Sequence, residues 1–364
     1  MITISLCMIV KNEEENLERC LASVKDIPDE IIIIDTGSQD QTKKVAEKYT
    51  SYIYDFQWNY NFAEARNKSF SYATMEYILW LDADDIILPE DKKKFLQLKQ
   101  SSSSLNDCIM MGYHLGFDEN NNIVTTLQRK RLVRRESSFQ WIGVVHEDLH
   151  TSSEISYMNS DISIFHNRSL KEYQKRSKTN RNIKIYEKLL AQGNTMSAHD
   201  IYHYAQELKN HEQYEKAIQY YQNFLEIPHI TIATKLSTYY HLTFCYRALE
   251  LFEEELDYTL KAFKDEIPQP CFCCQLGDWF VKNNQFAQAI YWYDLALTIP
   301  NPVNEIDYKP FRTWYPHEKL AFCYYQIKNY QKSLYHNECL LKYKSDNQDV
   351  KNNIKLLQDL LGHI

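Results

Sequence analysis

The hydrophobic pattern of this chain changes near residue 173, and that change constrains its fold more than any other feature of the sequence. Before it, short apolar runs alternate with amphipathic segments, which is typical of strands alternating with helices. After it, apolar residues recur at helical spacing only. A chain of 364 residues is also long enough for two cores. We therefore predict an α/β domain over residues 1–172, a connecting helix over 173–196 and an all-α domain over 197–364.

The apolar runs of the first part predict a buried and mostly parallel sheet. Residues 2–10, 31–34 and 77–81 are nearly continuous apolar runs, as expected for strands that are covered on both faces. Amphipathic segments over 14–25 and 62–74 predict helices between them. In open sheets of this kind, ligands bind beyond the carboxyl ends of the strands. We expect the polar clusters that follow these runs to meet at one sheet edge.

The most informative of these clusters is Asp82-Ala83-Asp84, which directly follows the run over 77–81. Carboxylates at a strand end suit a hard divalent cation such as Mg²⁺ or Mn²⁺, which can neutralise charge on a leaving nucleoside diphosphate. Alone, such a triplet is a weak signal in a chain with 49 acidic residues. Its position at a strand end, with Arg66 upstream as a cation suited to a diphosphate, makes it a stronger one.

Four motifs, in this order along the chain, resemble glycosyltransferase family 2. They are Cys7-Met-Ile-Val-Lys-Asn-Glu13, Ile33-Ile-Asp-Thr-Gly-Ser-Gln-Asp40, Phe62-Ala-Glu-Ala-Arg-Asn67 and Trp80-Leu-Asp-Ala-Asp84. Within that family, three later motifs are most similar to the sublancin-type bacteriocin peptide S-glycosyltransferases: Val145-His-Glu147, Phe165-His166 and Lys178-x-x-Arg181-Asn182. The resemblance covers about the first 180 residues and implies a GT-A (Rossmann-like) nucleotide-sugar domain.

The resemblance also implies a metal-dependent, inverting transfer from a UDP-sugar, with a role for each matching residue. The residues implied to bind the nucleotide sugar are Val10, Asn12, Glu13, Asp35, Arg66, Asp82 and Ala83. The residues implied to bind the divalent metal, Mn²⁺ or Mg²⁺, are Asp84 and His166. A lone histidine at a strand end can instead be a hydrogen-bonded structural residue, and this alternative stays open for His166.

An inverting transfer needs a general base, because the attacking hydroxyl or thiol loses its proton as it reaches the anomeric carbon. Glu147 is the candidate, and its neighbour Asp148 could serve instead. His146 could orient the diphosphate or the carboxylate. The alternative interpretation of this segment is a solvated acidic turn.

The second half of the chain resembles tetratricopeptide repeats, which are helical pairs with a period of about 34 residues. Small or apolar residues align in the second helix of each predicted pair, at Ala217, Leu256, Ala289 and Ser333. Gly277 marks a position where one helix must pack closely on the next. Stacked repeats leave a concave surface, which as a class engages extended peptides.

Composition excludes other classes of function. A net charge of −8 argues against a nucleic-acid partner, which needs a clustered basic surface. The short basic run at 129–131 and 134–135 is interpreted as a solvated strand edge or loop, with a polyanion site as the alternative. No long apolar window predicts an integral membrane segment, and the opening strand lacks the features of a signal peptide, so we expect a cytoplasmic protein. The nine cysteines are expected to be reduced, and the cluster Cys271, Cys273 and Cys274 is expected to be buried and apolar, with a metal site as the alternative.

We therefore predict a metal-dependent inverting glycosyltransferase that moves a sugar from a UDP-sugar to a Cys, Ser or Thr side chain of a peptide or protein. One alternative is a glycosyltransferase for a cell-surface or lipid-linked saccharide. Another is a repeat adaptor without catalysis. The sequence leaves open the donor sugar, the acceptor, sulfur or oxygen as nucleophile, and a homodimer.

Overall fold

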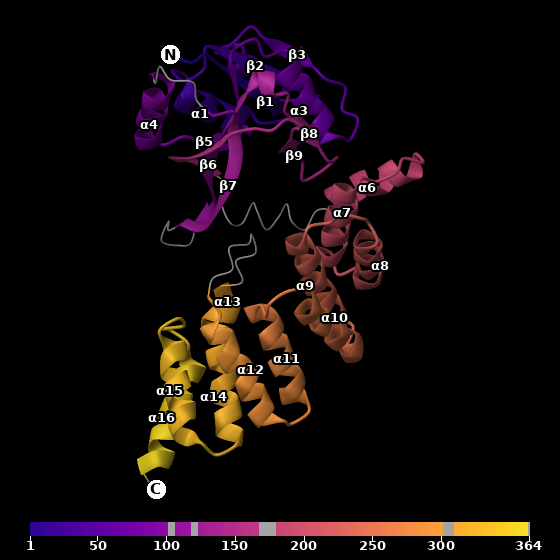
Figure 1. Cartoon of the computed structure of the whole chain (residues 1–364). Helices are drawn as coiled ribbons and strands as arrows, with labels where there is room; N and C mark the ends of the chain where they lie inside the picture. The colour runs from indigo at the N-terminus through magenta and orange to yellow at the C-terminus, as the bar shows by residue number, and fades with distance from the viewer. Residues whose placement is uncertain (101–105, 118–122, 167–179, 301–308, 363–364) are drawn as a thin grey trace. The chain divides into compact units, whose positions relative to one another are not determined.

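The computed structural model describes residues 1–100, 106–117, 123–166, 180–300 and 309–362 (Figure 1). They form two compact units, Met1–His203 and Tyr204–Ile364. The first unit has a mixed sheet with helices on it and the second consists of helices, which confirms the predicted α/β, GT-A-like architecture followed by an all-α, tetratricopeptide-like part. Of the predicted connecting segment, residues 173–179 lie outside the described residues, and helix α6 (Arg181–Ala191) lies in the rest.

The described part of the first unit contains an eight-stranded sheet in the order β3-β2-β1-β4-β7-β6-β10-β5. Its strands are β1 (Ile4–Val10), β2 (Glu30–Asp35), β3 (Ile53–Asp55), β4 (Tyr77–Trp80), β5 (Asp85–Ile86), β6 (Cys108–Phe117), β7 (Ile123–Arg134) and β10 (Tyr157–His166). Strands β1 to β4 pair in parallel, as predicted, whereas β7 runs antiparallel to both β4 and β6. A separate two-stranded sheet joins β8 (Gln140–Ile142) to β9 (Asp148–His150).

The register of the parallel strands brings their carboxyl ends together. Val10 pairs with Asp35, and Asp35 pairs with Asp55. On the other side of β1, β4 ends at Trp80, just before the triplet that begins at Asp82. The polar clusters therefore meet at one sheet edge, which confirms the expectation from the sequence.

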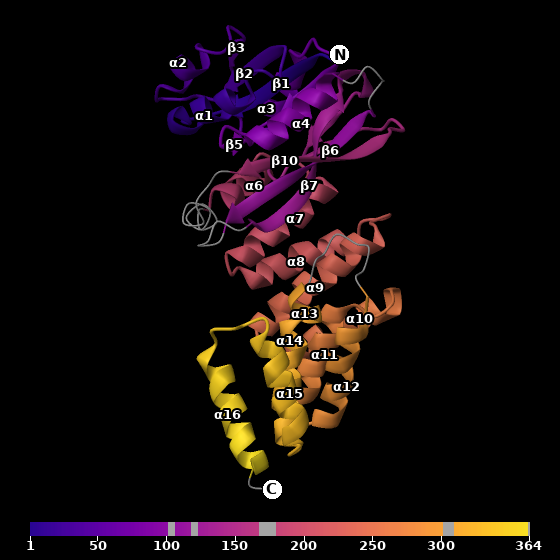
Figure 2. The same cartoon turned by 90° about the vertical axis from the view of Figure 1, so that its left-hand side faces the viewer.

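Helices cover both faces of the sheet (Figure 2). They are α1 (Glu14–Val24), α2 (Thr42–Ala46), α3 (Phe62–Ser71) and α4 (Pro89–Gln100). Because successive side chains of a strand point to opposite faces, each face has a core of its own. One core contains Leu6 of β1 with residues of α1, α2 and α4, and the other contains its neighbour Cys7 with residues of α3 and β8. As predicted, α1 buries one stripe of residues, at Leu17, Cys20, Leu21 and Val24. None of the described helices is both long and apolar enough to span a bilayer.

The prediction that the basic run is a solvated strand edge or loop is wrong for Arg131, whereas Arg129, Lys130, Arg134 and Arg135 are partly or fully exposed. Arg131 is fully buried and forms an ion pair with Asp85, which is also fully buried. The ladder between β6 and β7 shifts register at this point, because Lys130 and Leu132 have consecutive partners and Arg131 between them has none. Such a bulge turns a side chain away from the regular alternation, which a sequence pattern does not reveal.

The second unit consists of helix pairs. It begins at Tyr204, within helix α7. The helices are α7 (Ala198–Asn210), α8 (Tyr214–Leu225), α9 (Ile232–Ala248), α10 (Phe252–Asp265), α11 (Pro270–Lys282), α12 (Phe286–Thr298), α13 (Lys309–Arg312), α14 (Trp314–Gln326), α15 (Tyr330–Leu341) and α16 (Gln348–Gly362). Each of four turns that join the helices of a pair contains one residue with a left-handed backbone; these residues are Glu212, Glu250, Asn284 and Lys328. After each, an N–H closes the preceding helix, as that of Gln213 does on the Leu208 carbonyl.

The second helices of the pairs share a buried position near their start. It is occupied by Ala217, Ala289 and Ser333. The alignment of Leu256 with these residues is wrong, because Glu255 occupies the buried position in α10 and Leu256 is only partly buried. Glu255 is tolerated there because Arg247 of α9 forms an ion pair with it at 2.5 Å. An apolar pattern misplaces the register where a paired charge replaces a small residue.

Gly277 lies in close contact with the next helix, as the sequence predicted. A Cβ added there would meet the ring of Tyr293 at 2.6 Å, and that ring is fully buried with its hydroxyl bonded to Asp278. We expect Gly277→Ala to destabilise the second unit by roughly 1–2 kcal/mol, because overpacking costs about 1–3 kcal/mol and helix propensity returns only about 1 kcal/mol. Urea unfolding measures the change. Gly362→Ala is the matched control, since an added Cβ there meets nothing within 4 Å; equal stability of the two variants would contradict the prediction.

All nine cysteines are free thiols and buried, including Cys271, Cys273 and Cys274, for which burial was predicted. Burial raises the pKa of Cys273 to about 12, and it also raises the pKa of Cys271 and Cys274. These three neighbours in α11 therefore remain protonated at neutral pH and act as small apolar side chains.

Candidate active site

A cleft of about 660 Å³ lies in the first unit, at the carboxyl ends of β1 and β4. Most of the residues predicted for the site line it: Val10, Asn12, Glu13, Arg66, Asp82, Ala83, Asp84, Glu147 and His166. Asp35 and Asp148 are not among its lining residues. The fold thus brings together side chains from five separate stretches of the chain.

Asp35, the last residue of β2, is buried and shapes a turn. Its Oδ1 accepts hydrogen bonds from the backbone N–H groups of Gly37 and Ser38, both at 2.9 Å. Its Oδ2 is buried without a hydrogen-bond partner among the described residues. Gly37 has a φ of +99°, which a residue with a Cβ rarely adopts. The turn carries Thr36, which does line the cleft.

The loop after β1 is fixed by hydrogen bonds to the loop after β2. Asn12 has a left-handed backbone with a φ of 52°, and its N–H donates to Ser38 Oγ at 3.0 Å. In return, its side-chain oxygen accepts from the N–H of Gln39 at 2.8 Å. The N–H of Glu13 donates to Thr42 Oγ1 at 2.8 Å. The two loops therefore hold one another, with Asn12 and Glu13 at the cleft.

Arg66 of α3 joins the acidic triplet to the later acidic segment. Its Nη2 donates to Asp82 Oδ1 at 2.7 Å, and its Nε donates to Glu147 Oε1 at 2.6 Å. The guanidinium also packs between two indoles, 5.0 Å from the ring centre of Trp80 and 4.8 Å from that of Trp141. Buried pairs of this kind fix geometry strongly, because breaking one leaves an uncompensated charge.

The charges of this group support one another. Burial by itself would lower the pKa of Arg66, but Asp82 and Glu147 outweigh it and raise that pKa. Burial would likewise raise the pKa of Asp82, but Arg66 and Arg131 lower it to about 2. Arg66 and Asp82 are therefore both ionised at neutral pH.

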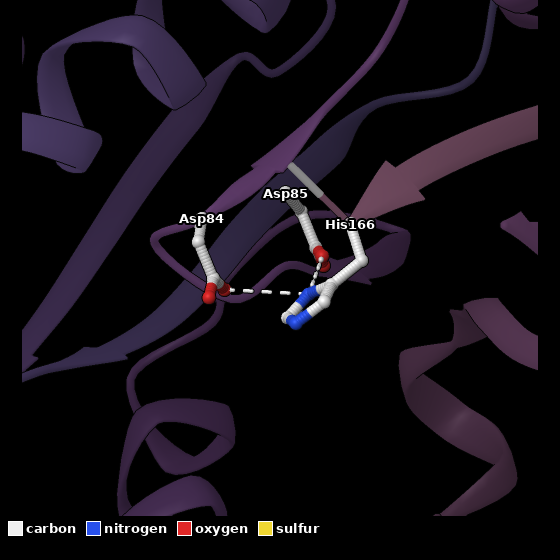
Figure 3. Close-up of side chains that lie close together, drawn as sticks. All are labelled: Asp84, Asp85 and His166. Carbon is white, nitrogen blue, oxygen red and sulfur yellow. Dashed lines mark hydrogen bonds and ion pairs between the residues drawn. The ribbon is translucent and has the colours of Figure 1, made fainter. Parts of the chain in front are cut away.

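Asp84, Asp85 and His166 form the one metal-compatible cluster found among the described residues (Figure 3). Their ligand atoms lie within 4.8 Å of one another. Nδ1 of His166 is 3.6 Å from Asp84 Oδ1 and 3.5 Å from Asp85 Oδ1. Two carboxylates and an imidazole offer the oxygen and nitrogen donors that Mn²⁺ and Mg²⁺ accept, so these residues fit the expected cation. Asp84 and His166 were expected from the sequence, and Asp85 was not.

Asp85 also has a structural role that the sequence did not reveal. Its Oδ2 accepts from Arg131 at 2.9 Å and from the N–H of Asp82 at 3.0 Å, and its Oδ1 accepts from the hydroxyl of Tyr113 at 2.9 Å. The Arg131 guanidinium packs between the rings of Trp80 and Tyr113, at 3.8 and 4.2 Å. Asp85 is thus an anchor that orients the triplet. The sequence indicated a role for Asp85 only by its position next to the triplet. Its partner Arg131 is distant in sequence, so the ion pair could not be predicted.

Glu147 and Asp148 point to different surroundings although they are neighbours in sequence. The Glu147 side chain lines the cleft, is 12% exposed and bonds to Arg66. Asp148 begins β9, is 49% exposed and accepts from Lys130 at 2.8 Å. Lys130 lies beside Arg131 in the same basic run. His146 also lines the cleft.

Two aromatic side chains and a cation complete the cleft wall without having been predicted as site residues. Trp58 and Phe62 contact each other edge to face, with ring centres 4.7 Å apart. The Arg181 guanidinium, at the start of α6, lies 5.2 Å from the Phe62 ring centre. Phe62 and Arg181 lie in motifs on which the family resemblance is based, and this position could have indicated that they belong to the site. Lys178 of the same motif lies outside the described residues.

Known proteins are similar to this region of the chain. Residues 5–153 match the model of the family described as Glycosyl transferase family 2. The chain is 30% identical over 206 residues to the SPbeta prophage-derived glycosyltransferase SunS of Bacillus subtilis, covering 52% of this chain and 45% of that protein. It is 47% identical over 90 residues to a TPR repeat-containing protein of Synechococcus elongatus, covering 25% of this chain and 22% of that one.

The chain thus spans less than half the length of these two curated relatives. Among solved structures, S. aureus TarS is similar with a TM-score of 0.37 and 16% identity, over 71% of this chain and 54% of that one.

Proposed function

We propose that this chain, whose residues 5–153 form a glycosyl transferase family 2 domain, is a metal-dependent inverting glycosyltransferase that uses a UDP-sugar. The observation that carries the proposal is the convergence of a metal-compatible cluster and a carboxylate–arginine–carboxylate chain on one cleft at the strand ends. Asp84 and His166 belong to the first, and Asp82, Arg66 and Glu147 to the second. Both would be needed where a diphosphate leaves and an acceptor loses a proton.

The nucleotide is proposed to bind at the ends of β1 and β2. Val10, Asn12 and Glu13 would contact the base, and the unpaired buried Oδ2 of Asp35 could accept from a base N–H after a small shift of the rim. Arg66 would face the base and diphosphate, and Asp82 with Ala83 the ribose. This assignment is supported by the hydrogen bonds that join the loop after β1 to the loop after β2, because preorganised groups lose little entropy on binding.

Asp84 and His166, with Asp85 behind them, would hold the divalent cation. When bound, it would neutralise the negative charge that develops on the leaving diphosphate. Glu147 is the proposed general base, which accepts the proton of the attacking hydroxyl or thiol at one of its carboxylate oxygens. Arg66 would keep that carboxylate directed at the cleft.

The acceptor is proposed to be a Cys, Ser or Thr side chain of a peptide or protein. The support is the tetratricopeptide-like unit, since such repeats as a class bind extended peptides. The buried free thiols support a reducing compartment, so we propose the cytoplasm as the site of action. A saccharide acceptor is the alternative, and a product assay with peptide and saccharide acceptors side by side would separate the two.

A thermal-shift panel of UDP- and GDP-sugars with Mn²⁺ tests the donor and the metal together. A UDP-sugar at about a hundred times its Kd should stabilise the chain by about 2.7 kcal/mol, because it binds the folded state only. That corresponds to a rise in Tm of several degrees. We expect EDTA to remove most of the shift, and Asp84→Asn to do the same with Mn²⁺ present.

The outcomes separate the proposed roles. A shift that survives both EDTA and Asp84→Asn would contradict the metal assignment and leave the donor assignment intact. No shift with any nucleotide sugar would count against the transferase. A shift without any sugar transfer or donor hydrolysis would favour an adaptor that binds nucleotide sugar without turnover.

A further inference from the structure

We infer that helices α6 and α7 position the proposed base Glu147, with Asp200 of α7 as the main positioning residue. The inference rests on the proposed function, because Glu147 matters as a base only if the chain transfers a sugar. The side chains that hold the loop, Tyr186, His199 and Asp200, lie beyond residues 5–153, which match the family model, whereas the loop itself lies within them.

The loop that carries Glu147 is not held by regular structure. Residues 143–147 connect β8 to β9, and no ladder of either sheet includes them. Gly143 and His146 have left-handed backbones, with φ values of 92° and 55°. Because buried N–H and C=O groups need partners, a loop of this kind must find them elsewhere. Its conformation therefore depends on what surrounds it.

Asp200 supplies the partner for the buried N–H of Val144. Its Oδ1 accepts that N–H at 3.0 Å, and its Oδ2 accepts the hydroxyl of Ser197 at 2.6 Å. Ser197 Oγ in turn accepts the N–H of Asp200 at 3.2 Å, in the first turn of α7. Asp200 is only 6% exposed. Both of its oxygens therefore accept a hydrogen bond.

The two residues that follow Val144 are held from the same helices. The hydroxyl of Tyr186 in α6 donates to the carbonyl of Val145 at 3.3 Å. Nε2 of His199 in α7 lies 2.9 Å from the carbonyl of His146 and donates to it. Three consecutive residues before Glu147 therefore each have a backbone group fixed by a side chain of α6 or α7. The next side chain along the loop is the one that bonds to Arg66.

Packing leaves the loop little room to move toward α7. A Cβ added at Gly143 would meet Cδ2 of the His199 ring at 2.5 Å. On the other side, the carbonyl of Val144 accepts from the N–H of Phe62, at the start of α3, at 3.0 Å. The loop is thus bounded by α3, which also carries Arg66, and by α7. Glu147 is directed into the cleft by contacts on both sides.

Asp200→Ala and Asp200→Asn form the test pair, because Asn keeps an oxygen acceptor for the Val144 N–H and Ala does not. We expect Asp200→Ala to lower kcat for sugar transfer by about 10- to 100-fold with KM for the nucleotide sugar within twofold, since a displaced base costs turnover rather than donor binding. Asp200→Asn should stay within about threefold of the wild type. In hydrogen exchange of the full chain, the Val144 amide should lose protection in the Ala variant and keep it in the Asn variant.

If Asp200→Ala fails to fold, Tyr186→Phe carries the test, because it removes a single oxygen and keeps the packing; a fall in kcat of about threefold or more at unchanged Tm supports the inference. Unchanged protection of Val144 in Asp200→Ala, or unchanged kcat in Tyr186→Phe, would overturn it. An equal loss of kcat in the Asn and Ala variants would also overturn it. A wild-type chain without transferase activity would refute the proposed function alone, because hydrogen exchange still decides whether Asp200 holds the loop.

Discussion

Glu147→Gln is expected to lower kcat for sugar transfer by about 10²–10⁴-fold, the usual contribution of a general base. The amide has nearly the same volume as the carboxylate, and its oxygen can still accept the Arg66 Nε hydrogen bond that Glu147 accepts at 2.6 Å. It cannot take up the acceptor's proton. Donor binding should change little, so steady-state kinetics with a saturating acceptor measures the effect, and the thermal shift with the UDP-sugar should persist.

Asp148→Asn is the matched control, one residue further along the chain. Asp148 pairs with Lys130 and is half exposed, outside the lining of the cleft. Its replacement should leave kcat within about threefold of the wild type, because exposed pairs contribute only about 0–1 kcal/mol. An active Glu147→Gln together with an inactive Asp148→Asn would move the base to Asp148.

Arg131→Met is expected to destabilise the first unit by about 3–5 kcal/mol, since it leaves the carboxylate of Asp85 buried without its cation. Both side chains of this pair are fully buried. Met fills much of the space of the arginine stem between Trp80 and Tyr113, so the loss reports on charge more than on volume. Urea unfolding, fitted with a separate transition for each unit, measures it.

The double variant Arg131→Met with Asp85→Asn provides the internal control. Asn still accepts the N–H of Asp82, and it carries no charge that needs a partner. We expect the double variant to be more stable than Arg131→Met alone, because removing both charges of a buried pair costs less than removing one. A loss below about 1 kcal/mol in Arg131→Met would mean that the pair is not needed to hold the triplet.

Local patterns predicted the parts of this chain that depend on local physics. The buried stripe of α1, the parallel strands β1 to β4 and the close contact at Gly277 follow from periodicity and from the steric demands of one small residue. The predicted convergence of the clusters that contain Asn12 and Asp82 depended on strand ends that share one edge, which parallel pairing enforces.

The pattern failed where a charge is neutralised by a partner distant in sequence. Arg131 looked like part of a solvated basic run, yet a bulge turns it inward onto Asp85, which neutralises it. In the second unit, Glu255 occupies a position that the alignment gave to Leu256, because Arg247 pairs with it. Burial of a charge depends on its partner's location in space, and sequence spacing does not encode that location.

The sequence by itself determined the two architectures, the order of the motifs and the strand end that carries Asp82 and Asp84. Hydrophobic periodicity and chain direction are properties of neighbouring residues, so they can be read without a structure. Only the tertiary structure decided that Asp85 joins the metal-compatible cluster and that Glu147 faces the cleft while Asp148 contacts Lys130. It alone also decided that Asp200 accepts the N–H of Val144, in the loop between β8 and β9. These depend on hydrogen bonds and ion pairs between segments far apart in sequence, whose geometry exists only once the chain has folded.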